Sequence, residues 1–282
     1  MILSKLKEFQ HYLVLFLVFL FIFSGAKESC AKLIEAESIL NQIIENNTSM
    51  SQFYLEVKVG VFDPESFFPL DEKIEDKLFP YEIIEKAFFQ NIVFIRDELL
   101  LIETLDSGGK PLHILIQEIG GKSFAYNFSE NRLFSTEDIL LPGTFFYTKH
   151  ISFLKKRLND LGISPIGVKI EHQDLYNVYQ LGSDSENLLV DPDDFKVLEI
   201  NYQVQILGRY YPIKASFSNW DRKSKRIPQT TTMQINSRIF KEISVVHLEF
   251  DRIYQKKNSL LNKYRDLIPP SSSVSLITSY AR

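Results

Sequence analysis

Residues 53–61 read FYLEVKVGV, and this stretch decides the fold class. The apolar residues at the odd positions, from Phe53 to Val61, share one face, whereas Tyr54, Glu56 and Lys58 share the other. Successive side chains of a strand point to opposite sides of the sheet, so this period of two predicts a half-buried β-strand. The chain is also rich in Phe and Tyr, which favour strands.

Similar patterns recur along most of the chain. Further strands are predicted at residues 91–96, 99–105, 112–119, 123–128, 168–172, 175–181, 187–190, 197–206, 211–217, 231–239 and 243–250. Short turns join neighbouring strands, for example at Gly108-Gly109 and Gly120-Gly121. Consecutive short strands with tight turns indicate antiparallel pairing.

Helical spacing of apolar residues occurs in fewer segments. It predicts a helix over residues 33–46 and a partly helical region over residues 136–162 that ends near Gly162. Strands and helices do not alternate, which excludes a doubly wound parallel sheet. We therefore predict an α+β fold in which a curved antiparallel β-sheet forms an open half-barrel and helices cover its concave face.

The first 31 residues have the features of a secretory signal peptide. Lys5 and Lys7 precede an apolar run over residues 12–23, and small residues follow, so we expect cleavage after Ala26 or Ala31. The run is shorter than the roughly 20 residues of a membrane span. The sequence therefore predicts a periplasmic protein, with attachment to the membrane through an uncleaved N-terminal segment as the alternative.

The remaining chain is expected to form one domain over residues 32–268. Prolines and an acidic stretch mark a helical insertion at residues 63–89, and residues 269–282 are expected to be a flexible tail. The single cysteine, Cys30, allows no internal disulfide, although it leaves lipidation open. We expect a monomer.

Several chemical functions lack support in the sequence. No basic stripe is present for nucleic acid, and we interpret the short basic run at residues 222–226 as a solvated loop. None of the histidines has zinc-ligand spacing, and no G-x-S-x-G motif occurs. The acidic run at residues 191–194 is interpreted as a turn, not a calcium site. We therefore predict no catalytic residues, no metal and no cofactor, and hence a protein that is not an enzyme.

Several motifs resemble those of the LolA/LolB family of periplasmic lipoprotein carriers and receptors, the outer-membrane lipoprotein-sorting proteins. The similar segments are residues 91–96, a strand that ends in an arginine; residues 121–127, which resemble the family's D-G-K-x-x-W/Y hairpin; residues 189–191 with 197–200; residues 211–214; and residues 243–245. The resemblance covers roughly residues 33–250. One departure is Asp97, because the family usually has a proline directly after the arginine.

The resemblance implies a function as well as a fold. In this family an open β half-barrel with a helical lid shields the acyl chains of a lipoprotein that crosses the periplasm. It implies an inner-membrane donor complex and an outer-membrane acceptor as partners. By the matched motif, Arg96 would be the latch that tethers the lid through hydrogen bonds to its backbone, although Asp97 could pair with Arg96 instead.

Lipid-binding residues are expected on the predicted strands, where plain core packing is the alternative role for each. These candidates are Phe53, Leu55, Val57, Val59, Ile92, Phe94, Ile213 and Phe217. Two other functions stay open. One is an envelope sensor or scaffold that binds a protein partner through the insertion, and the other is an exported hydrolase.

Overall fold

The computed structural model describes residues 35–62, 87–118, 123–129, 131–136, 144–173, 176–206, 209–222 and 226–267. The predicted signal peptide, residues 63–86 of the predicted insertion and the predicted tail lie outside these residues. No helix in the described part of the chain combines the length and the apolar character needed to cross a membrane.

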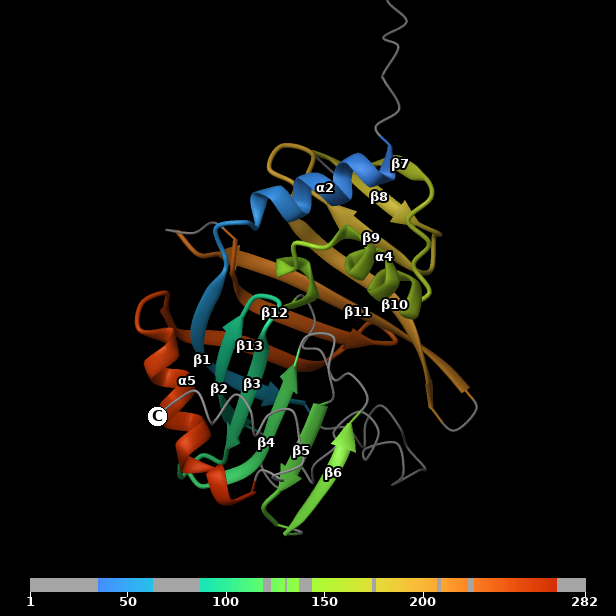
Figure 1. Ribbon diagram of the computed structural model, residues 1–282. Helices are drawn as coiled ribbons and strands as arrows, with labels where there is room; N and C mark the ends of the chain where they lie inside the picture. The colour runs from blue at the N-terminus through green and yellow to red at the C-terminus, as the bar shows by residue number, and fades with distance from the viewer. Residues whose placement is uncertain are drawn as a thin grey trace, which may run out of the picture. The chain divides into compact units, whose positions relative to one another are not determined.

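Thirteen strands of the described residues form one antiparallel sheet (Figure 1). They are β1 (Gln52–Val61), β2 (Ala87–Ile95), β3 (Leu99–Leu105), β4 (Pro111–Glu118), β5 (Ser123–Asn127), β6 (Arg132–Thr136), β7 (Val168–Gln173), β8 (Tyr176–Gly182), β9 (Asn187–Val190), β10 (Val197–Ile206), β11 (Arg209–Trp220), β12 (Pro228–Ile235) and β13 (Arg238–Glu249). The helical segments are α2 (Ala36–Asn46), η3 (Thr144–Tyr147), α4 (Ile151–Asp160), α5 (Ile253–Lys263) and η4 (Arg265–Leu267).

The order of the strands explains where the helices lie. It runs β6-β5-β4-β3-β2-β1-β13-β12-β11-β10-β9-β8-β7, so β6 and β7 are consecutive in sequence but occupy opposite edges of the sheet. The connection from β6 to β7 must therefore cross the sheet, and its described part contains η3 and α4. These two segments and α2 contact one another and share a hydrophobic core with one face of the sheet. The predicted α+β fold, a curved open sheet with helices on its concave face, is confirmed.

The amphipathic pattern of the sequence accounts for the helices on the concave face. Ile39, Leu40 and Ile43 of α2 are fully buried, as are Leu154 and Leu158 of α4. These spacings place apolar side chains on one stripe of each helix, which packs against the sheet. Helix α4 ends just before Gly162, whose positive φ of 79° is the left-handed conformation expected after a helix.

A second hydrophobic core lies on the opposite face, which the sequence analysis did not foresee. Helix α5 contacts β1 and β2, and its Ile253 and Leu261 pack with Leu99, Leu101 and Ile116. Strand β3 is consequently buried on both faces. Its continuous apolar run at residues 99–102 is typical of a strand covered on two sides, because both sets of alternating side chains then lie in apolar surroundings.

The structure differs from the prediction in the bounds of some strands and in two elements that were not predicted. Strand β2 begins at Ala87, so the last three residues of the predicted helical insertion belong to the sheet. The predicted strand at 231–239 is divided between β12 and β13, because Asn236 and Ser237 form a turn with positive φ. Strand β6 and helix α5 were missed. In α5 the stripe at 253, 257 and 261 is interrupted by Lys257, which hides the helical pattern.

Candidate functional site

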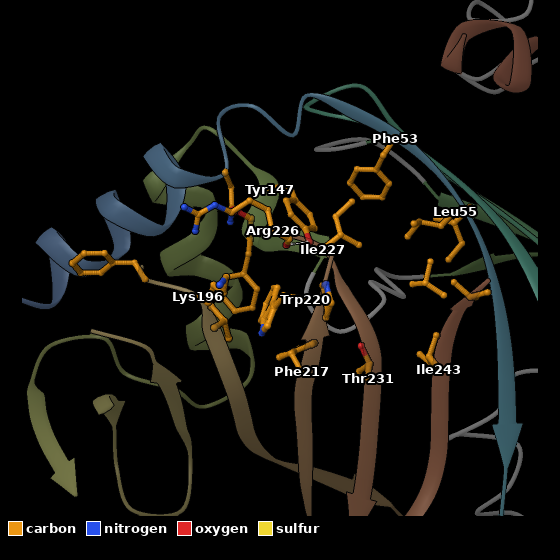
Figure 2. Close-up of a pocket in the computed structure, with 18 residues that line it drawn as sticks. Phe53, Leu55, Tyr147, Lys196, Phe217, Trp220, Arg226, Ile227, Thr231 and Ile243 are labelled. Carbon is orange, nitrogen blue, oxygen red and sulfur yellow. Dashed lines mark hydrogen bonds between the residues drawn. The ribbon is translucent and has the colours of Figure 1, made fainter. Parts of the chain in front are cut away.

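A cavity lies between the concave face of the sheet, η3 and Asn47, the residue that follows α2 (Figure 2). Its volume is about 90 Å³, and the hollow measures about 820 Å³ when the part open to solvent is included. One water needs about 10–15 Å³ of the smaller of these volumes, so the cavity has room for several non-hydrogen atoms. Its described lining is Asn47, Phe53, Leu55, Val57, Ile92, Phe146, Tyr147, Phe195, Lys196, Val197, Phe217, Trp220, Arg226, Ile227, Pro228, Thr231, Ile243 and Val245.

The apolar wall follows directly from the strand register. In β1, Val57 is opposite Val245 of β13, and Ile243 of β13 is opposite Thr231 of β12. Thr231 is in turn opposite Phe217 of β11. Directly opposed residues of antiparallel strands share a face, and Ile243 and Val245 share a face because they are two positions apart in β13. Two neighbouring rows of mostly apolar side chains therefore line the cavity, one formed by Val57 and Val245 and the other by Ile243, Thr231 and Phe217.

Aromatic rings close the cavity on the side of η3. The Phe53 ring stacks on Phe94 with 4.8 Å between centroids, and Tyr147 of η3 meets Phe53 edge to face at 5.3 Å. The Tyr147 hydroxyl donates a hydrogen bond of 2.9 Å to the backbone oxygen of Arg226. Burial raises the pKa of Tyr147, so the hydroxyl stays neutral at physiological pH.

Five of the eight predicted lipid-binding residues line this cavity, namely Phe53, Leu55, Val57, Ile92 and Phe217. The other three, Val59, Phe94 and Ile213, are buried in the hydrophobic core on the same face. The structure therefore gathers the first group around one cavity and places the second in the core. Lipid binding by the five residues stays a prediction.

Arg96 follows β2 and connects the sheet to the end of α2. Its Nη2 atom donates two hydrogen bonds of 2.7 Å, to the backbone oxygens of Asn47 and Thr48. Burial lowers the pKa of Arg96, and the neighbouring Asp97 carboxylate opposes this shift. The Asp97 carboxylate itself lies 3.4 Å from the Lys149 ammonium, so the structure pairs it with another cation.

The sequence analysis missed the cationic side chains of the cavity. Lys196 ends the turn between β9 and β10, and its ammonium contacts the Asp194 carboxylate and lies 5.6 Å from the centroid of Trp220. Arg226, in the loop between β11 and β12, donates a 2.9 Å hydrogen bond to the backbone oxygen of Asp194. Of the basic run at residues 222–226, which was interpreted as a solvated loop, Arg226 is partly buried and lines the cavity, where its backbone oxygen accepts the Tyr147 hydrogen bond.

One row of polar side chains crosses β2–β5 on the concave face, beside apolar residues such as Ile102 and Leu115. The strand register places Gln90, Thr104, His113 and Asn127 in one row, next to Val57, and all four polar residues are buried. Gln90 Nε2 donates a 3.2 Å hydrogen bond to Thr104 Oγ1. Burial lowers the pKa of His113 to about 4, so this imidazole is neutral at pH 7.

The described residues contain no candidate metal-binding site. No group of three His, Cys, Asp or Glu side chains comes together there in a way that could hold an ion. The acidic run at residues 191–194 is a turn in which the Asp191 carboxylate accepts hydrogen bonds from the backbone of Asp193 and Asp194. These carboxylates thus stabilise the turn through their own backbone.

Comparison with known proteins shows that the fold of this chain, but not its sequence, is similar to that of solved structures. No model of a protein family matches the chain, and no curated protein matches its sequence. Among solved structures it is similar to a LolA superfamily protein from Nitrosomonas europaea, with a TM-score of 0.50 and 12% identity over 79% of this chain and 96% of that one. It also resembles a putative outer membrane lipoprotein-sorting protein domain from Vibrio parahaemolyticus, with a TM-score of 0.48 and 10% identity over 77% and 92%. The first likeness shows that this chain has a LolA-like fold.

Proposed function

We propose that this protein is a carrier that binds the acyl chains of a lipoprotein, or of another lipid, in the cavity beneath η3 and α2. The observation that carries the proposal is an unfilled apolar cavity on the concave face of a LolA-like sheet. A carrier needs only a dry, adaptable surface, and within the described residues the lining contains no carboxylate or histidine that would suggest catalysis.

The energetics suit this role. Each methylene group that moves from water to an apolar site gains about 0.8 kcal/mol. The cavity offers such a site, because Phe53, Val57, Ile92 and Phe217 are at most 6% exposed to solvent. Their aromatic and branched side chains form the wall that a hydrocarbon chain would contact.

We propose that α2 and η3 form the lid and that Arg96 is its latch. The end of α2 is held by polar contacts to its neighbours: the Arg96 bonds, a 3.2 Å bond from Asn47 Nδ2 to the Phe146 oxygen, and a 3.0 Å bond from Asn46 Nδ2 to the Asp194 oxygen. When such a hydrogen bond breaks, water can replace the lost partner, so its net contribution to stability is small. Contacts of this kind therefore suit an element that opens and closes.

The location and the partners of the carrier belong to the same proposal. We infer export to the periplasm by residues 1–31, loading at an inner-membrane complex and delivery to an outer-membrane acceptor. The predicted signal peptide and the LolA-like fold support this inference together.

Adjacent residues of β13 provide a matched test. Val245 lines the cavity, whereas Val246 is 63% exposed on the other face of the strand. A Trp at position 245 adds bulk to the cavity, so Val245→Trp should abolish uptake of the neutral probe N-phenyl-1-naphthylamine, while Val246→Trp should bind it like the natural protein. Circular dichroism of both variants checks their folding. No probe uptake by the natural protein, or equal uptake by folded Val245→Trp, would contradict the proposal.

A further inference from the structure

The cavity has one charged end. Figure 2 shows Lys196, Arg226 and Trp220 on the side of α2, whereas Leu55 and Ile243 lie on the other side, with Phe217 and Thr231 between them. Within the part of the chain that the structure describes, Lys196 and Arg226 are the charged side chains of the lining, and both are cationic. We call Lys196, Arg226 and Trp220 the cationic end.

A plain hydrocarbon does not match this end. The Lys196 side chain is only 16% exposed, so an apolar ligand that covered it would remove much of its remaining hydration. The Asp194 carboxylate compensates this ammonium in part, but an apolar ligand would supply no polar partner for the cationic end, and desolvation of charged groups without such a partner is costly. A ligand with a negative head satisfies both parts of the cavity, because its head contacts the cations and its tail contacts the apolar wall.

The surroundings hold the two cations in place. The turn at residues 191–196 is closed by a 2.9 Å hydrogen bond from the Asp191 N–H to the Lys196 oxygen, and the Asp194 carboxylate contacts the Lys196 ammonium. The Arg226 guanidinium and Asn46 both donate to the backbone oxygen of Asp194. Trp220 adds a ring between the polar and apolar parts, a position that suits its amphipathic indole.

From this arrangement we infer that the ligand is an anionic amphiphile, whose carboxylate or phosphate head binds at Lys196 and Arg226 while its acyl chain extends along the apolar wall toward Leu55 and Ile243. The inference rests on the proposed carrier function and narrows its ligand class. Arginine and lysine both bind carboxylates and phosphates through charge-assisted hydrogen bonds.

The test compares ligands with one tail and three heads: hexadecanol, hexadecanoate and hexadecyl phosphate, each below the concentration at which it aggregates. Each compound displaces N-phenyl-1-naphthylamine from the purified full chain. We expect at least one of the two anions to bind about tenfold more tightly than the alcohol, because its head would form charge-assisted hydrogen bonds with the cations. Tighter binding of hexadecanoate indicates a free fatty acid as the source, and tighter binding of hexadecyl phosphate indicates a phospholipid-like head.

Variants separate ligand contact from structural support. Lys196→Gln should remove most of the preference for anions, because it should weaken binding of the two anions much more than binding of hexadecanol. Asp194→Asn removes the carboxylate that competes for Lys196 and should strengthen binding of the anions. Lys214→Gln is the charge-matched control, because Lys214 pairs with Glu199 away from the cavity lining.

The outcomes are distinguishable. Equal affinity for hexadecanol and both anions, or a loss in Lys196→Gln that is the same for all three compounds, overturns the anionic assignment but leaves the carrier function intact. Failure of all three compounds to displace the probe overturns both.

Discussion

The Arg96 guanidinium, at the end of β2, lies 2.7 Å from the backbone oxygen of Asn47, at the end of α2. This contact joins residues far apart in sequence and ties β2, which contributes Ile92 to the cavity lining, to the segment after α2, which contributes Asn47. The same Nη2 atom also donates to the Thr48 oxygen, so one side chain holds the two residues that follow the helix.

Removal of this contact should loosen the cover of the cavity. In Arg96→Met the two charge-assisted hydrogen bonds are lost, so we expect faster amide hydrogen exchange in α2 and faster exchange of bound probe. Lys155→Met is the control, because it breaks only a solvent-exposed pair between α4 and Glu37 of α2, and such pairs contribute about 0–1 kcal/mol. Unchanged exchange rates in Arg96→Met would rule out a latch.

The contact between α5 and the outer face of the sheet should depend on Glu103. This carboxylate is almost fully buried and accepts hydrogen bonds from Asn91, Lys263 and Tyr264. Burial acts to raise its pKa, but these hydrogen bonds outweigh burial and lower the pKa below its usual value. Replacement of Glu103 by Gln should therefore cost about 1–3 kcal/mol of unfolding free energy at pH 7.

The pH dependence of this effect has a defined sign. Because the pKa of Glu103 is lower in the folded state, its contribution is complete above the usual carboxyl pKa and is lost as the pH falls through the folded value. The difference in unfolding free energy between the natural protein and Glu103→Gln should thus shrink on acidification, as urea titrations at several pH values would show. Glu98→Gln is the comparison, since Glu98 pairs with Lys257 of the same helix but is 38% exposed. An equal cost for both substitutions would contradict a special role for the buried carboxylate.

Acidification should also act through His113 in the polar row of the concave face. Its pKa is about 4 in the folded protein against 6.5 for an ordinary histidine, because burial disfavours the charged ring. Below pH 6.5 the unfolded chain takes up the proton first, so stability falls, by about 1.5 kcal/mol between pH 6.5 and 5. This slope should be absent in His113→Gln, and an NMR titration of the His113 ring in the natural protein should have its midpoint near 4. A midpoint near 6.5 would show that the ring is hydrated.

Most strands could be predicted because their side chains alternate locally. The predicted ranges 99–105 and 187–190 match β3 and β9, and the helix at 33–46 contains α2. Helix α5 could not be recognised in the same way, because Lys257 occupies a buried position of its stripe. The ammonium is accommodated there by Glu98, which lies 159 residues earlier in the chain. Sequence patterns report local periodicity and do not contain such distant partners.

The cavity was predictable in part. Phe53, Leu55 and Val57 belong to a strand whose apolar face was evident from the sequence, and the structure places all three in the cavity lining, whereas their role in lipid binding stays a prediction. Lys196 and Arg226 were not identified, since each lies in a polar loop that is typical of solvent-exposed structure. Only tertiary contacts bring these cations to the same cavity, because Arg226 contacts both Tyr147 and Asp194, which are distant from it in sequence.

The sequence by itself determined that the chain forms a curved antiparallel sheet with helices, because the period of its apolar residues depends on neighbours two to four positions apart. The tertiary structure decided which apolar side chains enclose space and which fill the core. It also decided that the charged side chains of Lys196 and Arg226 lie at one end of the cavity. Those properties arise when β1 pairs with β13 and when the connection from β6 to β7 crosses the concave face, and both events join segments that are distant in sequence.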